Sequence, residues 1–590
     1  MCGIVPIVNW QFRQAGLNPW LPASVPGTVH TDLEANGIIE DSFYRLNEHE
    51  QQWIDKVNWE YRATITIDGE LLKEQNIDLV CYGLDTFCNI YVNDHIVLSA
   101  NNMFRTWRTN IKEYLKVGEN TLLVCFHSPV LEGLAHQEAF GLRLPSANDL
   151  SEIGGLGQNR ISMFTRKAGY HYGWDWGPRL VTSGIWRPIE LQVWSHVRIE
   201  DVYIRQNSVS EDRAELSALI TIDSTSKNQL KISCESQSHN ASILIEKNID
   251  INAGLQQVEL PFDIDNPTLW WSNGLGEPNL YTFDISIKNG NRDLKKTKVR
   301  TGIRSIKLVR QPDEKGESFY FELNGISVFA KGANYIPNDS FLPRVSQNVY
   351  IKVVSDAADA NMNMLRVWGG GVYENDTFYN LCDEMGIMVW HDFMFACSLY
   401  PGEPDFIDNV KHEAIDNVTR LRNHPCMALW CGNNEINYGW QYYGVDKWAW
   451  KRDYTPEQQL RLNRQYELLF HSLLPDIVAQ YTNTCYWPSS PMSGPEPNQH
   501  ASYENSSGDM HYWGVWHDLH PFENFEKYVG RFMSEYGFQS FPEFDTIKRF
   551  TIPSDWDIES EVMASHQRSG IGNLRIKEYM ESEYNLSLIH

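Results

Sequence analysis

The sequence has no long hydrophobic run and no cysteine motif. Nothing in it approaches the ~18 consecutive apolar residues of a membrane span, and residues 1–9 are too short and too uncharged for a signal peptide. The ten cysteines are scattered, without C-x-x-C spacing or the density of a disulfide scaffold. We therefore expect no membrane partner. The location is cytoplasmic as the chain is written, or periplasmic, secreted or lysosomal if a leader has been removed.

Basic residues are scarce as well. Lys and Arg number 50 against 76 Asp and Glu, which leaves a net charge of −26 on 590 residues. An acidic surface repels phosphate backbones, so we expect no nucleic-acid partner. The composition, 42% apolar and 21% charged, excludes a disordered or fibrous chain. At roughly 150 residues per domain, the length predicts about four domains.

Three regions with different patterns follow one another along the chain. Short β-branched and aromatic alternation predicts a β-sandwich for 1–195 and an immunoglobulin-like β-sandwich for 196–302. In 303–590 short apolar strands alternate with helical stretches, which is typical of a (β/α)8 barrel. Seven strands are expected there, at Val328–Lys331, Met364–Trp368, Ile387–Trp390, Met427–Trp430, Cys485–Pro488, Met510–Trp513 and Arg531–Ser534. The predicted fold class is therefore multidomain, β plus α/β.

The predicted barrel lacks its last strand. The residues after Glu535 are helical in character, and Asn585–His590 is too short to serve as an eighth strand. Seven strands leave an open edge with unpaired backbone groups. We therefore expect the 590-residue chain to be a fragment, poorly soluble or inactive by itself, of a natural protein that is longer.

Two glutamates stand at the ends of predicted barrel strands. Glu435 follows Met427–Trp430 in the segment WCGNNE, and Glu535 ends Arg531–Ser534 in MSEYG. The reactive groups of such barrels lie at the carboxyl ends of strands, and closure brings the fourth and seventh strands near one another. A pair of carboxylates flanking one bond is what glycoside hydrolysis requires. A single acidic residue at a strand end is more simply explained as a solvated surface group. Two such glutamates, each flanked by Asn, Gly and aromatic residues, favour a catalytic role.

Several aromatic-rich motifs are spread along the chain. They are WLPASVPGTVHTDL at 20–33, GWDWGPR at 173–179, KGANYIP at 331–337 and RVWGGG at 366–371. With the two glutamate motifs, they make the sequence similar to the β-mannosidases of glycoside hydrolase family two. The resemblance implies a jelly-roll domain, an immunoglobulin-like domain and a catalytic barrel, followed by further β domains. It also implies a retaining exo-β-mannosidase without cofactors, with Glu435 as acid/base, Glu535 as nucleophile and a β-mannoside oligosaccharide as substrate.

The two glutamates need opposite protonation states. Glu435 has to hold a proton near neutrality, which desolvation by Trp368, Trp430 and Trp440 and the charge of Glu535 would favour. Glu535 has to stay ionised and therefore needs hydrogen-bond donors.

The remaining site residues follow from strand position and from the resemblance. Arg366 and Tyr512, at neighbouring strand ends, are the expected donors to Glu535. The resemblance places Asn434 at the sugar 2-hydroxyl, where contacts strengthen toward the transition state. It also implies that the loop carrying Trp174 and Asp175 reaches the barrel mouth from the first domain. Further pocket residues are Trp368, Asp392 and Trp440.

Other functions find less support in the sequence. His511, His517 and His520 lack metal-ligand spacing and no H-E-x-x-H occurs, so no metal site is expected. An exo-β-glucosaminidase or β-galactosidase is one rival, against which the Asn433-Asn434-Glu435 triplet argues. A non-catalytic carbohydrate-binding fragment is the other, and the two intact carboxylates oppose it. The oligomeric state, the natural glycan and the aglycone preference stay open.

Overall fold

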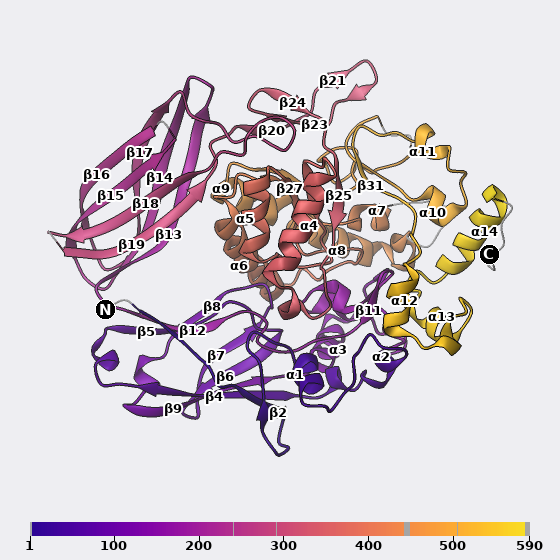
Figure 1. Cartoon of the computed structure of the whole chain (residues 1–590), viewed down its shortest axis with the longest axis horizontal. Coiled ribbons are helices and arrows are strands. Elements are labelled where there is room, and N and C mark those ends of the chain that lie inside the picture. The colour runs from indigo at the N-terminus through magenta and orange to yellow at the C-terminus, as the bar shows by residue number, and fades with distance from the viewer. Residues whose placement is uncertain (1–2, 240, 291, 442–448, 504–505, 585–590) are drawn as a thin grey trace.

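The first region is a β-sandwich. The computed structural model describes residues 3–239, 241–290, 292–441, 449–503 and 506–584. Two sheets, ordered β3-β2-β4-β9-β6-β7 and β1-β12-β5-β8, lie at the lower edge of Figure 1. In β4 every second residue is buried, from Trp59 to Ile67, because alternate side chains of a strand face the core. The strands are β1 Gly3–Pro6, β2 Gln11–Gln14, β3 Leu21–Pro22, β4 Trp59–Ile67, β5 Asn76–Cys81, β6 Phe87–Val92, β7 His95–Asn101, β8 Trp107–Asn110, β9 Gly118–Phe126 and β12 Ile189–Trp194.

Helices and one short hairpin are inserted into this sandwich. The hairpin of β10 and β11 carries the GWDWGPR motif and leaves the sandwich toward the barrel. The inserted elements are α1 Val29–Ala35, α2 Asn47–Glu50, α3 Pro129–Phe140, β10 Tyr172–Trp174 and β11 Gly177–Arg179.

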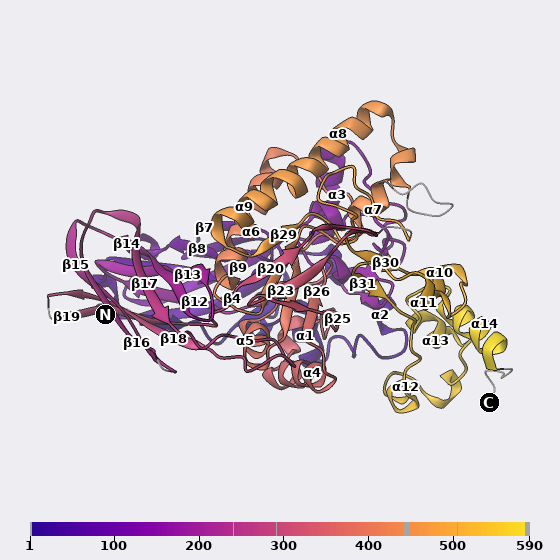
Figure 2. The ribbon, with the colours of Figure 1, turned by 90° about the horizontal axis from the view of Figure 1, so that it is seen from above.

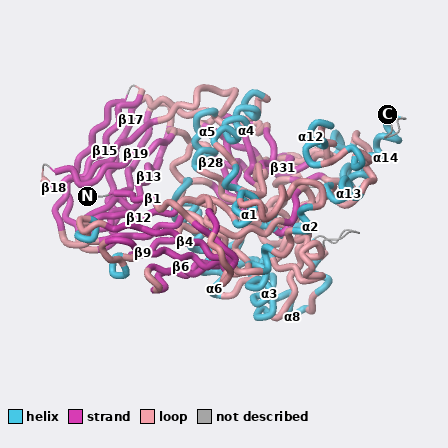
Figure 3. The backbone as a smooth tube through the Cα atoms, turned by 60° about the horizontal axis from the view of Figure 1, so that its bottom comes forward, coloured by secondary structure: helices cyan, strands magenta, loops and turns pink. Residues whose placement is uncertain are grey.

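The second region is an antiparallel sandwich of three and four strands, ordered β13-β14-β17 and β16-β15-β18-β19. Seven strands in two sheets around one apolar core match the predicted immunoglobulin-like architecture. Figure 3 shows both sandwiches as the two bodies rich in strands. The strands are β13 Val197–Val209, β14 Arg213–Ser224, β15 Asn228–Ser238, β16 Ala241–Ile251, β17 Gly254–Asp265, β18 Tyr281–Asn289 and β19 Arg292–Thr301.

Small antiparallel sheets precede the barrel, and they correct the predicted first barrel strand. Val328 ends β24, which pairs with β23 across a turn at Asn324 and Gly325, both with positive φ. Asn-Gly is the preferred pair for such a hairpin turn. The barrel therefore starts one strand later, at β25. These elements are β20 Ile306–Val309, β21 Pro312–Asp313, β22 Gly316–Glu317, β23 Tyr320–Leu323, β24 Ile326–Val328 and β25 Gly332–Tyr335.

The third region is a parallel barrel surrounded by helices (Figure 2). Strands β25 to β29 form one parallel sheet in chain order, and β30 pairs in parallel with β31. All residues of β26, β27 and β28 are buried, as expected for parallel strands covered on both faces. Six predicted strands are confirmed as β26 Met364–Val367, β27 Met388–Asp392, β28 Met427–Cys431, β29 Cys485–Trp487, β30 Met510–Tyr512 and β31 Met533–Tyr536.

The helices follow the predicted alternation. Helices α8 and α9 are joined by a π-helical turn at Leu468–Leu473. None of the described helices is long and apolar enough to cross a bilayer. The helices are α4 Gln347–Asp359, α5 Asp376–Met385, α6 Pro404–Leu421, α7 Ile436–Gln441, α8 Pro456–Glu467, α9 Leu474–Tyr481, α10 Gly514–Asp518, α11 Asn524–Lys527, α12 Phe544–Phe550, α13 Glu561–His566 and α14 Gly572–Tyr584.

The first and seventh barrel strands approach each other without a ladder between them. Asn334 of β25 donates through Nδ2 to the carbonyl of Ser534 in β31, at 3.0 Å. Within the described ranges there is no eighth barrel strand, which agrees with the predicted fold class. Residues 585–590 lie outside those ranges.

The first sandwich is fixed to the barrel by a buried ion pair. Arg166 and Glu413 of α6 are 2.6 Å apart with side chains 1% exposed, and Asn102 also donates to Glu413. Arg45 pairs with Asp555, which brings the helices after β31 against the same domain (Figure 1). Because a buried ion pair such as Arg166–Glu413 is costly to break, this part of the first domain is held against the barrel.

Candidate active site

The two predicted catalytic glutamates meet at one imidazole. His511 Nδ1 lies 2.8 Å from Glu435 Oε1 and 3.4 Å from Glu535 Oε2. One carboxylate oxygen of each glutamate and a ring nitrogen of His511 all lie within 4.8 Å of one another. The ends of barrel strands four and seven therefore converge, as the strand count predicted for the two glutamates. Strand six adds His511, which the sequence analysis did not place in the site.

The backbone at Glu435 is held in an unusual conformation. Its φ of 61° is left-handed, which is strained for a residue with a side chain. Helix α7 begins at the next residue, and the side chain of Asn433 accepts from the amide of Ile436. The amide of Glu435 itself donates to the carbonyl of Ser490 at 2.7 Å. These bonds hold the strained turn and so fix the direction of the carboxylate.

Arg366 connects the predicted nucleophile to two further site residues. Its Nη1 bonds Glu535 Oε1 and Asn334 Oδ1, and its Nη2 bonds Asp392 Oδ2 and Asn434 Oδ1, the last two at 2.7 Å. Burial lowers the pKa of the Arg366 guanidinium, but the carboxylates of Asp392 and Glu535 outweigh it and raise the pKa above its ordinary value. The guanidinium therefore stays charged, and the expected role of Arg366 as donor to Glu535 agrees with the geometry.

His511 reverses the expected electrostatics of Glu435. Burial pushes the pKa of Glu435 up, but the hydrogen bond and positive charge of His511 hold it below its ordinary value. Burial likewise lowers the pKa of His511, yet the charges of Glu535 and Glu435 raise it overall. The prediction that desolvation decides the pKa of Glu435 is therefore wrong, because it did not include the hydrogen bond and charge of His511 beside the carboxylate.

A loop of the first domain reaches these carboxylates. Burial, followed by the negative charges of Glu435 and Glu535, raises the pKa of Asp175 to about 6. Beside Asp175, the ring of Trp174 stands edge-on against Trp368 with centroids 4.6 Å apart. The structure thus brings Asp175, Trp174 and Trp368 to the barrel mouth, as the resemblance implied.

The triple-glycine motif lets this loop approach closely. The amide of Tyr170 donates to the carbonyl of Gly370 at 3.1 Å. A Cβ on Gly370 would lie 1.7 Å from the ring of Trp368. Any larger residue at position 370 would therefore collide with the indole of Trp368.

Tyr512 is not a donor to Glu535 in this structure. Its hydroxyl bonds His520 Nδ1 at 3.0 Å, while the indole of Trp513 donates to Glu535 Oε2 at 3.3 Å. Neighbouring residues of a strand face opposite sides, so His511 and Trp513 face the glutamates and Tyr512 faces away. The alternation of the segment MHYW could have revealed this, but its register cannot be fixed from sequence.

Asp392 is not at the pocket surface either. It is 0% exposed, and its oxygens accept from Arg366, from the Trp390 indole at 2.9 Å and from the amide of Gly369 at 3.1 Å. Its partners are all within the protein, so Asp392 holds Arg366 in place and is not available to a sugar.

Trp440 and Asn434 are both buried and lie within five residues of Glu435 in sequence. Trp440 lies in α7, 2% exposed, with its ring centroid 6.0 Å from that of Tyr454. Asn434 donates through Nδ2 to Cys397 Sγ at 3.2 Å, and that thiol lies 3.4 Å from Glu435 Oε2. Cys397 is thus a further site residue that the sequence did not indicate. The expected contacts of Trp440 and Asn434 with substrate stay predictions.

Besides Glu435, His511 and Glu535, a second cluster of residue types that can bind metals lies at the amino end of β28. Asp383 Oδ2 is 2.6 Å from His424 Nδ1, and the amide of Cys426 donates to Asp383 Oδ1. Each of these bonds ties α5 to the segment that leads into β28, so packing accounts for them.

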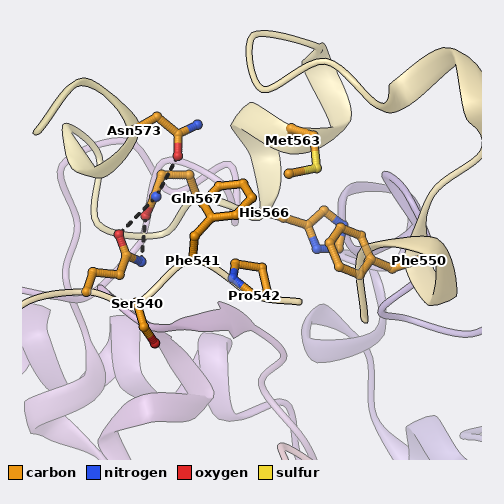
Figure 4. A pocket seen from close by; sticks show the side chains of 9 residues that line it. Ser540, Phe541, Pro542, Phe550, Met563, His566, Gln567 and Asn573 are labelled. Atoms are coloured by element: carbon orange, nitrogen blue, oxygen red, sulfur yellow. Dashed lines mark hydrogen bonds between the residues drawn. The ribbon is translucent and has the colours of Figure 1, made fainter. Parts of the chain in front are cut away.

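A surface pocket of about 230 Å³ lies between the loop after β31 and helices α12 to α14 (Figure 4). The amide of Gln567 exchanges hydrogen bonds with Gln539 and donates to Asn573 at 2.8 Å. None of the residues predicted for catalysis lines this pocket, which Ser540, Phe541, Pro542, Phe550, Met563 and His566 complete.

Comparisons with known proteins agree on one family. Residues 10–187 match the galactose-binding domain-like region of glycosyl hydrolase 2, and residues 197–304 match glycosyl hydrolases family 2. The β-mannosidase B of Aspergillus niger is 34% identical over 584 residues, which are 97% of this chain and 67% of that protein. The β-mannosidase B of Aspergillus terreus is 33% identical over 97% of this chain and 66% of its own.

A solved structure is similar over almost the whole chain. The crystal structure of a β-D-mannosidase from Dictyoglomus thermophilum superposes with a TM-score of 0.90 at 39% identity, covering 99% of this chain and 69% of that one. The chain spans about two thirds of the length of the curated relatives that it matches.

Proposed function

This chain belongs to glycoside hydrolase family 2, and on that premise we propose that it acts as a retaining exo-β-mannosidase on terminal β-linked mannose of manno-oligosaccharides. The observation that carries the proposal is the pair Glu435 and Glu535, held within reach of the same imidazole nitrogen at the barrel mouth. The names of the similar proteins, which are β-mannosidases, favour mannose as the sugar.

The spacing of the two carboxylates supports retention. Retaining enzymes hold these groups about 5 to 5.5 Å apart, whereas inverting enzymes leave about 6.5 to 9.5 Å for a water molecule. One carboxylate oxygen of Glu435 and one of Glu535 lie within 4.8 Å of each other, which favours the closer spacing.

Two steps follow from these positions. Glu535 attacks the anomeric carbon, the bond to the leaving oxygen breaks, and Glu435 gives that oxygen a proton. Water then attacks the same carbon, gives its proton to Glu435, and releases Glu535 from the ester. Arg366 donates a charged hydrogen bond to Glu535 Oε1 and so orients the attacking carboxylate before the first step.

The loop of the first domain supports the exo-acting assignment. Asp175 can accept hydrogen bonds from hydroxyls of the terminal sugar, while Trp174 and Trp368 form an apolar wall beside it. Burial and the two glutamates, which raise the pKa of Asp175 to about 6, make its ionised form costly, and the hydroxyl groups of a bound sugar would supply donors that stabilise it.

A panel of nitrophenyl glycosides, together with mannobiose, tests the sugar assignment. We expect hydrolysis of the β-mannoside and of mannobiose, with much slower turnover of β-galactoside and β-glucosaminide. Preferred hydrolysis of another sugar would favour the exo-β-glucosaminidase or β-galactosidase alternative. Mannose binding without any turnover would favour a carbohydrate-binding protein.

A further inference from the structure

His511 sits in a chain of hydrogen bonds that fixes one of its two ring protons. Its Nε2 lies 3.0 Å from Ser490 Oγ, and Ser490 Oγ donates to Asp509 Oδ2 at 2.6 Å. Ser490 has a single hydroxyl proton, and Asp509 uses it. Nε2 of His511 must therefore carry a hydrogen and donate it to Ser490.

The bonding of Asp509 supports this direction. Its Oδ1 accepts from the indole of Trp487 and from the amide of Met492, both at 2.9 Å. Its Oδ2 accepts from Ser490 and also from Ser534 Oγ, each at 2.6 Å. Four donors converge on one buried carboxyl group, which is the pattern of an ionised carboxylate.

The other ring nitrogen faces two acids. Nδ1 of His511 is 2.8 Å from Glu435 Oε1, and two ionised carboxylates there require it to carry a hydrogen as well. A second arrangement keeps the 2.8 Å hydrogen bond: the proton moves to Glu435 Oε1, which then donates to a neutral Nδ1, and only the longer ion pair of Nδ1 with Glu535 Oε2 is lost. One proton can therefore lie on either side of this hydrogen bond without breaking any other hydrogen bond.

We propose that His511 is a positioning residue that stores the proton which Glu435 delivers to the leaving oxygen. The proposal rests on the proposed glycosidase function. In the free protein the proton lies on Nδ1. When a glycosidic oxygen replaces water at Glu435, the Nδ1–H bond breaks and an O–H bond to Glu435 forms, so the imidazolium and the carboxylate become neutral together. The proton that water gives up in the second step returns by the same route.

The charges around His511 fit this role. Glu435 and Glu535 face Nδ1, Asp509 acts through Ser490 on Nε2, and Arg366 opposes them with a positive charge. Burial lowers the pKa of His511, but the two glutamates raise it above its ordinary value. The transfer to Glu435 removes one positive and one negative charge, so the net charge of the buried site does not change.

The variant His511→Asn tests the proposal. Asparagine keeps an N–H group at the distance of Nδ1 but cannot hold a second proton. Because a proton shared by two sites has a higher apparent pKa than either site alone, the alkaline limb of kcat/KM on mannobiose should move to lower pH. We expect a shift of about one pH unit, which is about a tenfold loss on that limb.

Two controls separate this role from a structural one. A dinitrophenyl β-mannoside, whose leaving group needs no proton, should show no such shift of its alkaline limb with His511→Asn. His412→Asn, at a half-exposed histidine of α6, should leave both profiles unchanged. If His511→Asn does not fold, Ser490→Ala replaces it, and its limb should move in the same direction by a smaller amount.

If the wild-type protein is active and these variants lower kcat by the same factor at every pH, without moving the alkaline limb, the role of His511 is overturned. Equal shifts on both substrates would overturn it as well. A wild-type protein that hydrolyses neither substrate contradicts the proposed function itself, so the two failures are distinguishable.

Discussion

The indole of Trp174, from the first sandwich, stands edge-on against Trp368 of the barrel with ring centroids 4.6 Å apart. This contact joins two residues that are far apart in sequence at the mouth that holds both glutamates. It means that the site is built by two domains, and that Asp175, next to Trp174, can serve the chemistry of the barrel.

Asp175→Asn should reduce activity without unfolding the protein. The change keeps the shape of the side chain and removes its charge, so hydrogen bonds from sugar hydroxyls weaken. We expect kcat/KM to fall by an amount equivalent to about 1–3 kcal/mol. Steady-state kinetics on mannobiose measure this, with Asp408→Asn on the exposed side of α6 as the control. Kinetics equal to those of the wild type would return Asp175 to a structural role.

The same variant should be more stable than the wild type above about pH 6. Burial and the two glutamates raise the pKa of Asp175 from 3.8 to about 6. A raised carboxyl pKa means that stability is fully present below about pH 4 and is lost as pH rises through about 6. Since each pKa unit is worth about 1.4 kcal/mol, the gain for Asp175→Asn at pH 7 should reach about 2–3 kcal/mol. Denaturant unfolding at pH 4 and pH 7 checks it, and a variant equally stable or weaker at pH 7 contradicts it.

Arg366→Gln should destabilise the protein strongly. Removing the guanidinium leaves Asp392, 0% exposed, without its charged partner, and leaves Glu535, 8% exposed, with the 3.4 Å contact to His511. Breaking a buried pair in this way costs about 3–5 kcal/mol. Arg205→Gln, which breaks an exposed pair with Glu259, should cost about 1 kcal/mol or less. Equal effects of the two changes on denaturant unfolding would show that Arg366 does not hold the site together.

Glu435→Ala and Glu535→Ala should fail in different ways. Loss of the nucleophile abolishes turnover of every substrate, because no covalent intermediate forms. Loss of the acid/base should harm poor leaving groups most, so that an activated aryl mannoside still forms the intermediate and azide speeds its release. Burst kinetics with and without azide distinguish them. If Glu435→Ala slowed mannobiose and the activated aryl mannoside equally, and azide did not restore the rate, the role of Glu435 would be contradicted.

The periodicity of the sequence predicted most of the frame of this site. Short apolar runs gave the strand ends, and therefore Glu435, Glu535 and Arg366, since parallel strands end at the same edge of a barrel. Asp175 came from the resemblance alone, because no local pattern relates a loop of the first domain to the barrel mouth.

Register and burial were beyond the sequence. β30 has only three residues, and a shift by one residue exchanges the side that His511 faces with the side that Tyr512 faces. Asp392 is a strand-end acid like the glutamates, and only the position of Arg366 shows that its oxygens are already occupied. The expected protonation of Glu435 was wrong for the same reason, since the charge that decides it belongs to His511.

The measurement that tests the central claim most directly is covalent labelling with a slow mannose analogue, such as a 2-deoxy-2-fluoro-mannosyl fluoride, followed by mass mapping of the labelled peptide. The fluorine slows both steps and the fluoride leaving group restores the first, so the ester accumulates. We expect one sugar per chain, attached to Glu535, together with loss of activity that excess substrate prevents. A protein that hydrolyses β-mannosides but carries the label on another residue, or carries none, would contradict the account.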